Sequence, residues 1–172
     1  ILKDFIKVNE DFEIIILRYF NPVGAHSSGK IGEDPNDTPN NLFPYILRVS
    51  IGEYERLNIY GDNYDTIDGS GVRDYIHVMD LSEGHVKALE KIKKGLNIYN
   101  LGTGKGISVL EMVKTFEEVN KCKIPYKIME RRNGDIGEIF ADVSKANDEL
   151  GWKANKTLKD ICKDGYNFIK LI

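Results

Sequence analysis

Hydrophobic residues change their spacing along the chain, and each spacing predicts a different element. The first apolar residues recur at helical spacing, at Ile1, Leu2, Phe5 and Ile6. Residues 13–20, EIIILRYF, have an unbroken apolar centre, which predicts a strand buried on both faces as in a parallel sheet, and Asn21-Pro22 is expected to end it. Because the chain opens on Ile1 inside a helical pattern, with no capping residue before it, we expect a fragment of a longer protein.

Helices and strands are expected to alternate over the rest of the chain. Apolar periodicity predicts helices over residues 42–56, 80–94, 145–150 and 158–169, and another that begins with the capping-box pair Ser108 and Glu111. Short apolar runs predict strands at residues 57–61, 72–78, 97–101 and 125–130. Residues 26–41 and 62–71 are polar and predict loops, and long loops in compact domains are usually functional or disordered. The alternation places the chain in the α/β class.

Composition narrows the classes of function. With 172 residues the chain can bury one sizeable core, and no apolar run approaches the roughly 18 residues that span a bilayer. The formal net charge of −3 gives no electrostatic case for nucleic-acid binding. Cys122 and Cys162 show no metal-ligand spacing and make no disulfide framework, so we expect a reduced, cytoplasmic protein with no nucleic-acid or membrane partner.

Two kinds of motif look chemical but have a simpler interpretation. Residues 102–106, GTGKG, follow a predicted strand and precede a predicted helix, yet the spacing is neither GxGxxG nor a Walker pattern. A tight turn between strand and helix is therefore expected there. The histidines His26, His77 and His85 are scattered, and the sequence predicts neither a catalytic base among them nor a metal site.

Polar residues at loop and strand ends are better candidates for binding. Asn21, Asn40 and Asn41 lie where binding residues tend to gather. Arg73 and Arg132 have guanidinium groups, which suit phosphate oxygens in two-point geometry, and a carboxylate such as that of Asp135 suits the vicinal hydroxyls of a ribose. The alternative is that these side chains are ordinary surface charges. Composition and spacing alone thus lead only to an α/β domain with candidate anion-binding arginines.

Several longer segments resemble the UDP-galactose 4-epimerase family, a branch of the extended short-chain dehydrogenase/reductases. They are residues 18–26 (RYFNPVGAH), 31–35 (IGEDP), 39–45 (PNNLFPY), 61–81 (GDNYDTIDGSGVRDYIHVMDL), 99–104 (YNLGTG) and 131–135 (RRNGD). The resemblance runs from Ile1 to about Asn167 in the family's order and close to its spacing. Shorter strings such as RYFNP also occur in other extended members, so residues 18–26, 31–35 and 61–81 carry most of the specificity.

The resemblance implies a fold and a reaction. It implies the C-terminal portion of an NAD-binding Rossmann-type protein, in which residues 1–24 are the last helix and strand of the truncated Rossmann domain. Residues 25–172 would be the smaller mixed α/β domain that binds the UDP sugar. The family interconverts UDP-glucose and UDP-galactose through a 4-keto intermediate with bound NAD, and a tyrosine in a Tyr-x-x-x-Lys motif takes the proton from the sugar 4-hydroxyl.

The resemblance also assigns roles to residues of this chain. Phe20 would lie beside the nicotinamide, and Ile139 beside the hexose. The remaining positions would bind the nucleotide-sugar as polar contacts (Asn21, Asn41, Leu42), around the uracil (Asn58, Ile59, Tyr60), at the diphosphate (Arg73, Arg132) and at the ribose (Asp135). With this alignment, surface charge becomes a poor explanation of Arg73, Arg132 and Asp135.

The chain departs from the family in the residues that perform the redox chemistry. The glycine-rich fingerprint and the catalytic Tyr-x-x-x-Lys are expected to lie upstream of Ile1, and five tyrosines here have no lysine four positions on: Tyr19, Tyr45, Tyr60, Tyr64 and Tyr75. We therefore expect no catalytic residue in this chain and no activity from it alone. The implied partners are UDP-glucose or UDP-galactose, the missing N-terminal half and, at full length, a second copy in a homodimer. Two alternatives remain: an epimerase for UDP-xylose or a UDP-N-acetylhexosamine, and a non-catalytic nucleotide-sugar binding module.

Overall fold

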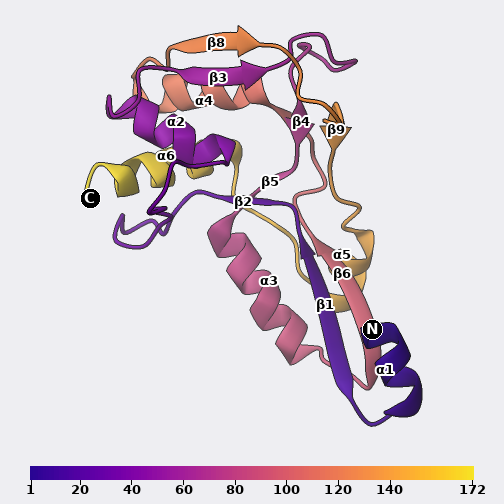
Figure 1. The fold of residues 1–172 in the computed structure, drawn as a ribbon. Coiled ribbons are helices and arrows are strands. Elements are labelled where there is room, and N and C mark those ends of the chain that lie inside the picture. Colours follow the sequence, from indigo (N-terminus) through magenta and orange to yellow (C-terminus); the bar gives the residue numbers. More distant parts are fainter.

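Helices and short strands alternate along the chain, and they pack into two groups that are joined at the middle of the molecule (Figure 1). The structure, a computed structural model, describes residues 1–172. The helices are α1 (Leu2–Val8), α2 (Leu42–Ser50), α3 (Val78–Glu90), α4 (Val109–Asn120), α5 (Ser144–Leu150) and α6 (Leu158–Ile169). The strands are β1 (Glu13–Tyr19), β2 (Asn21–Val23), β3 (Leu57–Tyr60), β4 (Val72–Arg73), β5 (Tyr75–His77), β6 (Gly95–Leu101), β7 (Ile107–Ser108), β8 (Tyr126–Met129) and β9 (Glu138–Ile139).

The strand group is built around β1 and β6, which lie parallel from the pair Glu13–Gly95 to the pair Tyr19–Leu101. The helices α3 and α5 pack beside this pair, and α1 lies at its far end (Figure 1). Its core is a cluster of 8 buried residues: Ile76, Leu81, Ala88, Tyr99, Leu101, Ala146, Leu150 and Trp152. The apolar run of β1 is only half-buried against this core, and α1 has no buried residue.

The second group, called the pocket group because a pocket opens in it, has the larger core. This core is a cluster of 15 buried residues drawn chiefly from α2, α4, α6 and β3. Phe116 of α4 is fully buried there, edge-to-face with Phe43 of α2 and with Tyr166 of α6. The parallel pair β3–β8 lies beside α4 (Figure 1), and a small sheet of order β7–β4–β9 lies next to it. Apolar spacing along three helices thus converges on one interior, as amphipathic helices require.

Short parallel strands β2 and β5 join the two groups, and here one sequence-based prediction was confirmed and one was wrong. The strand predicted over residues 13–20 ends at Tyr19, before Asn21-Pro22, and Asn21 begins a separate strand, β2, in which it pairs with Tyr75. The single strand predicted over residues 72–78 is divided into β4 and β5 at Asp74. The carboxylate of Asp74 accepts hydrogen bonds from the amides of a glycine-rich turn elsewhere in the chain. Local sequence spacing does not encode such a tertiary contact.

Helix ends differ from prediction for local reasons. The helix predicted over residues 42–56 ends at Ser50, and Gly52 follows with a positive φ of 79° that favours glycine and stops the helix. The helix predicted over residues 80–94 runs over Val78–Glu90 and is capped by His77, whose ring accepts from the Met79 amide. At Ser108 the cap is present, because its hydroxyl accepts from the Glu111 amide.

The predicted domain boundary after residue 24 stays a prediction, since elements on both sides of it share the smaller core. Ile15 and Leu17 of β1 pack with residues of α3, β6 and α5. None of the helices is long and apolar enough to cross a membrane.

Candidate binding site

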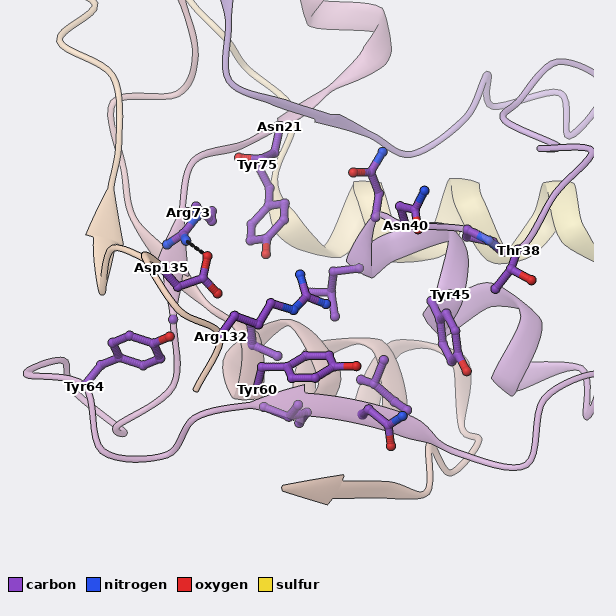
Figure 2. Close-up of a pocket in the computed structure, with 18 residues that line it drawn as sticks. Asn21, Thr38, Asn40, Tyr45, Tyr60, Tyr64, Arg73, Tyr75, Arg132 and Asp135 are labelled. Carbon is purple, nitrogen blue, oxygen red and sulfur yellow. Dashed lines mark ion pairs between the residues drawn. The ribbon is translucent and has the colours of Figure 1, made fainter. Parts of the chain in front are cut away.

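A pocket of about 500 Å³ opens in the pocket group, between β3, the start of α2 and the loop that follows β8 (Figure 2). Most of the residues to which the sequence assigned binding roles line it: Asn21, Asn41, Leu42, Asn58, Ile59, Tyr60, Arg73, Arg132 and Asp135. Phe20 and Ile139 are not among the lining residues. The fold therefore brings together side chains that are spread over more than a hundred positions of sequence.

Strand ends and helix starts place these side chains. Asn21 opens β2, Arg73 closes β4, and residues 58–60 form the end of β3. The polar segment Thr38–Asn41 reaches the pocket where α2 begins. Side chains at the ends of strands and helices lie next to loops, where binding residues tend to gather on a rigid scaffold.

The two arginines of the pocket are held in different ways. The Arg73 guanidinium donates to the carbonyl of Val72 at 2.8 Å and lies 3.9 Å from a carboxylate oxygen of Asp135, the ion pair drawn in Figure 2. The Arg132 guanidinium lies 3.9 Å from the centroid of the Tyr60 ring. Together they give the pocket a cationic side, with Asp135 as an acceptor next to it.

Tyr75 is a pocket residue that the sequence prediction missed. Its ring is almost fully buried, and Figure 2 shows its hydroxyl pointing into the pocket towards Arg132. Burial raises the pKa of Tyr75 to about 12, against the opposing effect of Arg73, so the phenol stays protonated and can donate a hydrogen bond. The alternation of Arg73 and Tyr75 across Asp74 is the sequence signal that could have revealed it.

Further lining residues were also missing from the predicted binding set. They are Thr38, Pro39, Tyr45, Leu57, Tyr64, Gly71 and Val109, whereas Asn40, which also lines the pocket, had been named as a polar candidate. Most lie in or beside segments that the sequence had already marked as polar loops or as neighbours of assigned positions, so their segments were foreseeable even where the individual side chains were not.

Asp74 occupies the glycine-rich turn of residues 102–104. The carboxylate accepts from the amides of Thr103 at 2.8 Å and Gly104 at 2.9 Å, and from the amide of Ala141 at 3.1 Å. A Cβ on Gly102 would lie 2.6 Å from an Asp74 carboxylate oxygen, so this position requires glycine. The turn is thus a cradle for an internal carboxylate, and its amides are not available to a phosphate.

The histidines lie outside the pocket, as does the one Tyr-x-x-x-Lys spacing in the chain. His77 is fully buried with its Nε2 3.3 Å from Asp164, and burial lowers its pKa while Asp164 opposes the shift. Contrary to the expectation that no such pair occurs, Tyr166 and Lys170 have the spacing. Tyr166 packs against the larger core, with the Lys170 ammonium 4.4 Å from its ring centroid, and neither residue lines the pocket.

The structure contains no group of three or more histidine, cysteine or acidic side chains that could hold a metal ion. Its two cysteines, Cys122 and Cys162, are free thiols.

Comparison with known proteins places this arrangement in context. The family model described as GDP-mannose 4,6 dehydratase matches residues 5–165. The chain is 57% identical over 172 residues to a UDP-glucose 4-epimerase of Pasteurella multocida, covering 99% of this chain and 51% of that protein. It is 52% identical over 174 residues to a bifunctional UDP-glucose and UDP-xylose 4-epimerase of Pisum sativum, covering 99% of this chain and 50% of the relative.

A crystal structure has the same fold over nearly the whole chain. It is the UDP-glucose 4-epimerase from Bifidobacterium longum in complex with NAD+ and UDP, with a TM-score of 0.94 and 51% identity. The match covers 98% of this chain and 50% of that one. The chain thus spans about half the length of the relatives it matches.

Proposed function

The chain belongs to the family described as GDP-mannose 4,6 dehydratase, and on that premise we propose that it is the UDP-sugar-binding half of a UDP-glucose 4-epimerase. The observation that carries the proposal is the pocket of about 500 Å³ into which Arg73, Arg132 and Asp135 converge. A nucleoside diphosphate sugar offers a diphosphate for the arginines and ribose hydroxyls for the carboxylate.

Each part of the substrate has candidate contacts in the pocket. Arg73 and Arg132 would bind the diphosphate, and Asp135 the ribose. The end of β3, residues 58–60, would flank the uracil, while Asn21, Asn41 and Leu42 would contact the nucleotide-sugar. Tyr75 adds a neutral hydroxyl donor beside the arginines. The charged end of the pocket thus suits the diphosphate, and its amide-rich end suits a neutral base.

NAD is the cofactor of the proposed reaction, and when bound it would take hydride from the sugar C4 and return it. The residues present do not suffice to hold this dinucleotide, because no strand is followed by a GxGxxG turn and the turn of residues 102–104 holds Asp74. Phe20, directly after β1, is the residue that we place beside the nicotinamide. The role of this chain is accordingly to bind and orient the sugar nucleotide.

A second substrate is supported by one comparison. The Pisum sativum relative is named for UDP-xylose as well as UDP-glucose, so the complete protein is a candidate for both sugars. Preference for galactose, action on N-acetylated sugars, a homodimer and a cytoplasmic location all remain proposals. The two free thiols support the last of these, since structural disulfides are rare in the cytoplasm.

The test compares two proteins, the complete protein that contains this chain and the 172-residue chain by itself. We expect the complete protein to interconvert UDP-glucose and UDP-galactose, and the chain by itself to have no measurable activity, because neither its pocket nor its Tyr166–Lys170 pair provides a catalytic base beside a sugar. Interconversion by the chain alone would refute this division of labour. UDP binding by a complete protein that does not interconvert the sugars would favour the non-catalytic binding module.

A further inference from the structure

Arg132 is held in the pocket by an aromatic face and by no polar group. Its guanidinium carbon lies 3.9 Å from the centroid of the Tyr60 ring, and the side chain makes no hydrogen bond and no ion pair with the protein. Arg73, by contrast, uses one of its nitrogens on the Val72 carbonyl and faces Asp135 with another. The pocket therefore contains one arginine with engaged donors and one whose donors are all free.

Stacking and hydrogen bonding use different parts of a guanidinium group. The cation attracts the ring through its flat face, while all five N–H donors point outwards in the guanidinium plane. An aromatic ring beneath Arg132 can therefore fix the plane of the guanidinium group, a planar fork of N–H donors, without occupying any of those donors. A carboxylate in the same place would fix it too, but would occupy the donors that a diphosphate needs and neutralise the charge.

We propose that Tyr60 is a positioning residue for Arg132, whose fork it holds towards the diphosphate of the ligand. The inference rests on the proposed function and goes beyond the role that resemblance gave to Tyr60, which was to flank the uracil. In Figure 2 the Arg132 guanidinium lies above the Tyr60 ring and reaches into the middle of the pocket. The ring is 36% exposed, so it can be replaced without opening a core.

A second stacked pair beside the pocket supplies a matched control. Arg131, the neighbour of Arg132, lies 3.7 Å from the centroid of the Tyr64 ring, but it does not line the pocket. The loop after β8 thus carries two successive arginines on two tyrosines, and only one of the guanidinium groups faces the ligand space. Removing Arg131 changes the charge as much as removing Arg132 does, and leaves the proposed fork intact.

The experiment titrates UDP and uridine against the complete protein by calorimetry. We expect Tyr60→Leu to weaken UDP binding about three- to tenfold, because the ring that orients Arg132 is lost. Tyr60→Phe keeps the ring face and should bind UDP within about twofold of the wild type. Uridine lacks the diphosphate, so Tyr60→Leu should weaken its binding clearly less than that of UDP, by no more than the ring's contact with the base contributes. Arg131→Ala should also leave UDP affinity within about twofold at moderate salt.

The double variant separates positioning from direct contact. Once Arg132 is absent, the ring has nothing to orient, so in an Arg132→Ala background Tyr60→Leu should weaken UDP binding no more than it weakens uridine binding. Equal losses for uridine and UDP would show that Tyr60 acts through the base alone, and would overturn the inference. So would a double variant whose loss equals the product of the two single losses.

Wild-type binding keeps this inference distinguishable from the proposed function. If the wild type binds UDP and Tyr60→Leu binds it equally well, only the inference is wrong. If the wild type does not bind UDP at all, the proposed function fails and the inference fails with it. Unfolding midpoints of the Tyr60 variants close to that of the wild type would confirm that any loss arises in the pocket.

Discussion

The pocket group buries its apolar residues more completely than the strand group does. The pocket group gathers 15 buried residues, chiefly from three helices and a strand, and leaves a defined cavity over that core. The strand group has 8 buried residues, a half-buried β1 and an α1 with no buried residue at all. The residues proposed to bind the ligand thus belong to the part that is internally complete, while the part expected to carry the cofactor is sparsely covered.

Polar contacts link segments of the two groups. Asp74 ties the β4–β5 break to the turn after β6, and Asp80 of α3 accepts from the amides of Asn155 and Lys156. Within the strand group, the Trp152 indole donates to the Asp80 carbonyl at 3.1 Å. Polar contacts of this kind fix the orientation of the two groups relative to each other. If the groups moved apart, each donor would lose its acceptor at the full desolvation cost of an unsatisfied polar group.

The largest effect expected from this difference is self-association of the 172-residue chain through the strand group. Apolar side chains exposed there include Val8 at 81% and Leu89 at 69%. Uncovered apolar surface of this kind favours association and limited solubility. We expect concentration-dependent sedimentation and binding of an apolar dye, both reduced by Val8→Lys combined with Leu89→Lys.

A control from the pocket group sharpens this comparison. Ile67 is 93% exposed on the loop between β3 and β4, so Ile67→Lys adds one lysine at an exposed apolar position without changing the strand group. It should leave association unchanged. A clean monomer over a wide concentration range, with no dye binding, would contradict the prediction.

The next effect concerns the connection at Asp74. Asp74→Ala should lower the free energy of unfolding by about 3 kcal/mol, because it leaves the half-buried amides of Thr103 and Gly104 and the buried amide of Ala141 without their acceptor. Asp74→Asn keeps one acceptor oxygen and should cost less. Urea unfolding of the complete protein measures both.

Asp148 provides the matched control for Asp74. It is exposed on α5 and makes no side-chain hydrogen bond or ion pair, so Asp148→Ala should change stability by no more than about 0.5 kcal/mol. An Asp74→Ala protein as stable as this control would mean that the turn of residues 102–104 does not depend on the carboxylate.

Within the pocket group, the diphosphate contacts give a smaller but specific effect. Arg132→Ala should weaken UDP and UDP-sugar binding together by roughly one to two decades, since a charged hydrogen bond is worth about 1.5–3 kcal/mol. Arg132→Lys should recover only part of the loss, because an ammonium cannot reproduce the planar fork. Titration of UDP and UDP-galactose gives the answer, with Arg56→Ala, an exposed arginine outside the pocket, as the control. Wild-type affinity in Arg132→Ala would show that the alignment at this end of the pocket is wrong.

Local pattern predicted the elements better than it predicted their interruptions. The run Ile14–Leu17 was enough to place β1, and helical spacing was enough to place α6 at its observed bounds. The break at Asp74 was not predictable, because its cause is a turn about 30 residues further on. Tyr75 was missed although its alternation with Arg73 across Asp74 is visible in the sequence.

Sequence spacing was also ambiguous for residues whose chemical role depends on their tertiary environment. Tyr166 and Lys170 have the spacing of a catalytic pair, yet tertiary packing puts the tyrosine against Phe116 and away from the pocket. For the pocket itself, resemblance named most of the lining residues, while composition alone could not distinguish Arg73 and Arg132 from surface charges. That distinction requires the strands and loops that bring them together.

The smallest effect on nucleotide affinity is expected at Ile139, at the margin of the pocket group. Ile139 is paired with Arg73 across the parallel strands β9 and β4, so the two side chains leave the sheet on the same face. It is 39% exposed and does not line the pocket that would hold the nucleotide. A position beside the diphosphate arginine but outside the nucleotide pocket fits the proposed role next to the hexose.

Ile139→Tyr should therefore narrow the sugar end of the site and spare the nucleotide end. We expect UDP affinity within about twofold of the wild type, and binding of an N-acetylated UDP sugar about tenfold weaker, because the larger ring competes with the N-acetyl group for space. Ile136→Tyr, at an exposed position on the same segment, is the control for adding a ring at the surface. Titration of UDP, UDP-galactose and the N-acetylated analogue decides the matter: if all three weaken equally, Ile139 does not read the sugar, and specificity must come from side chains that this chain does not place beside Arg73.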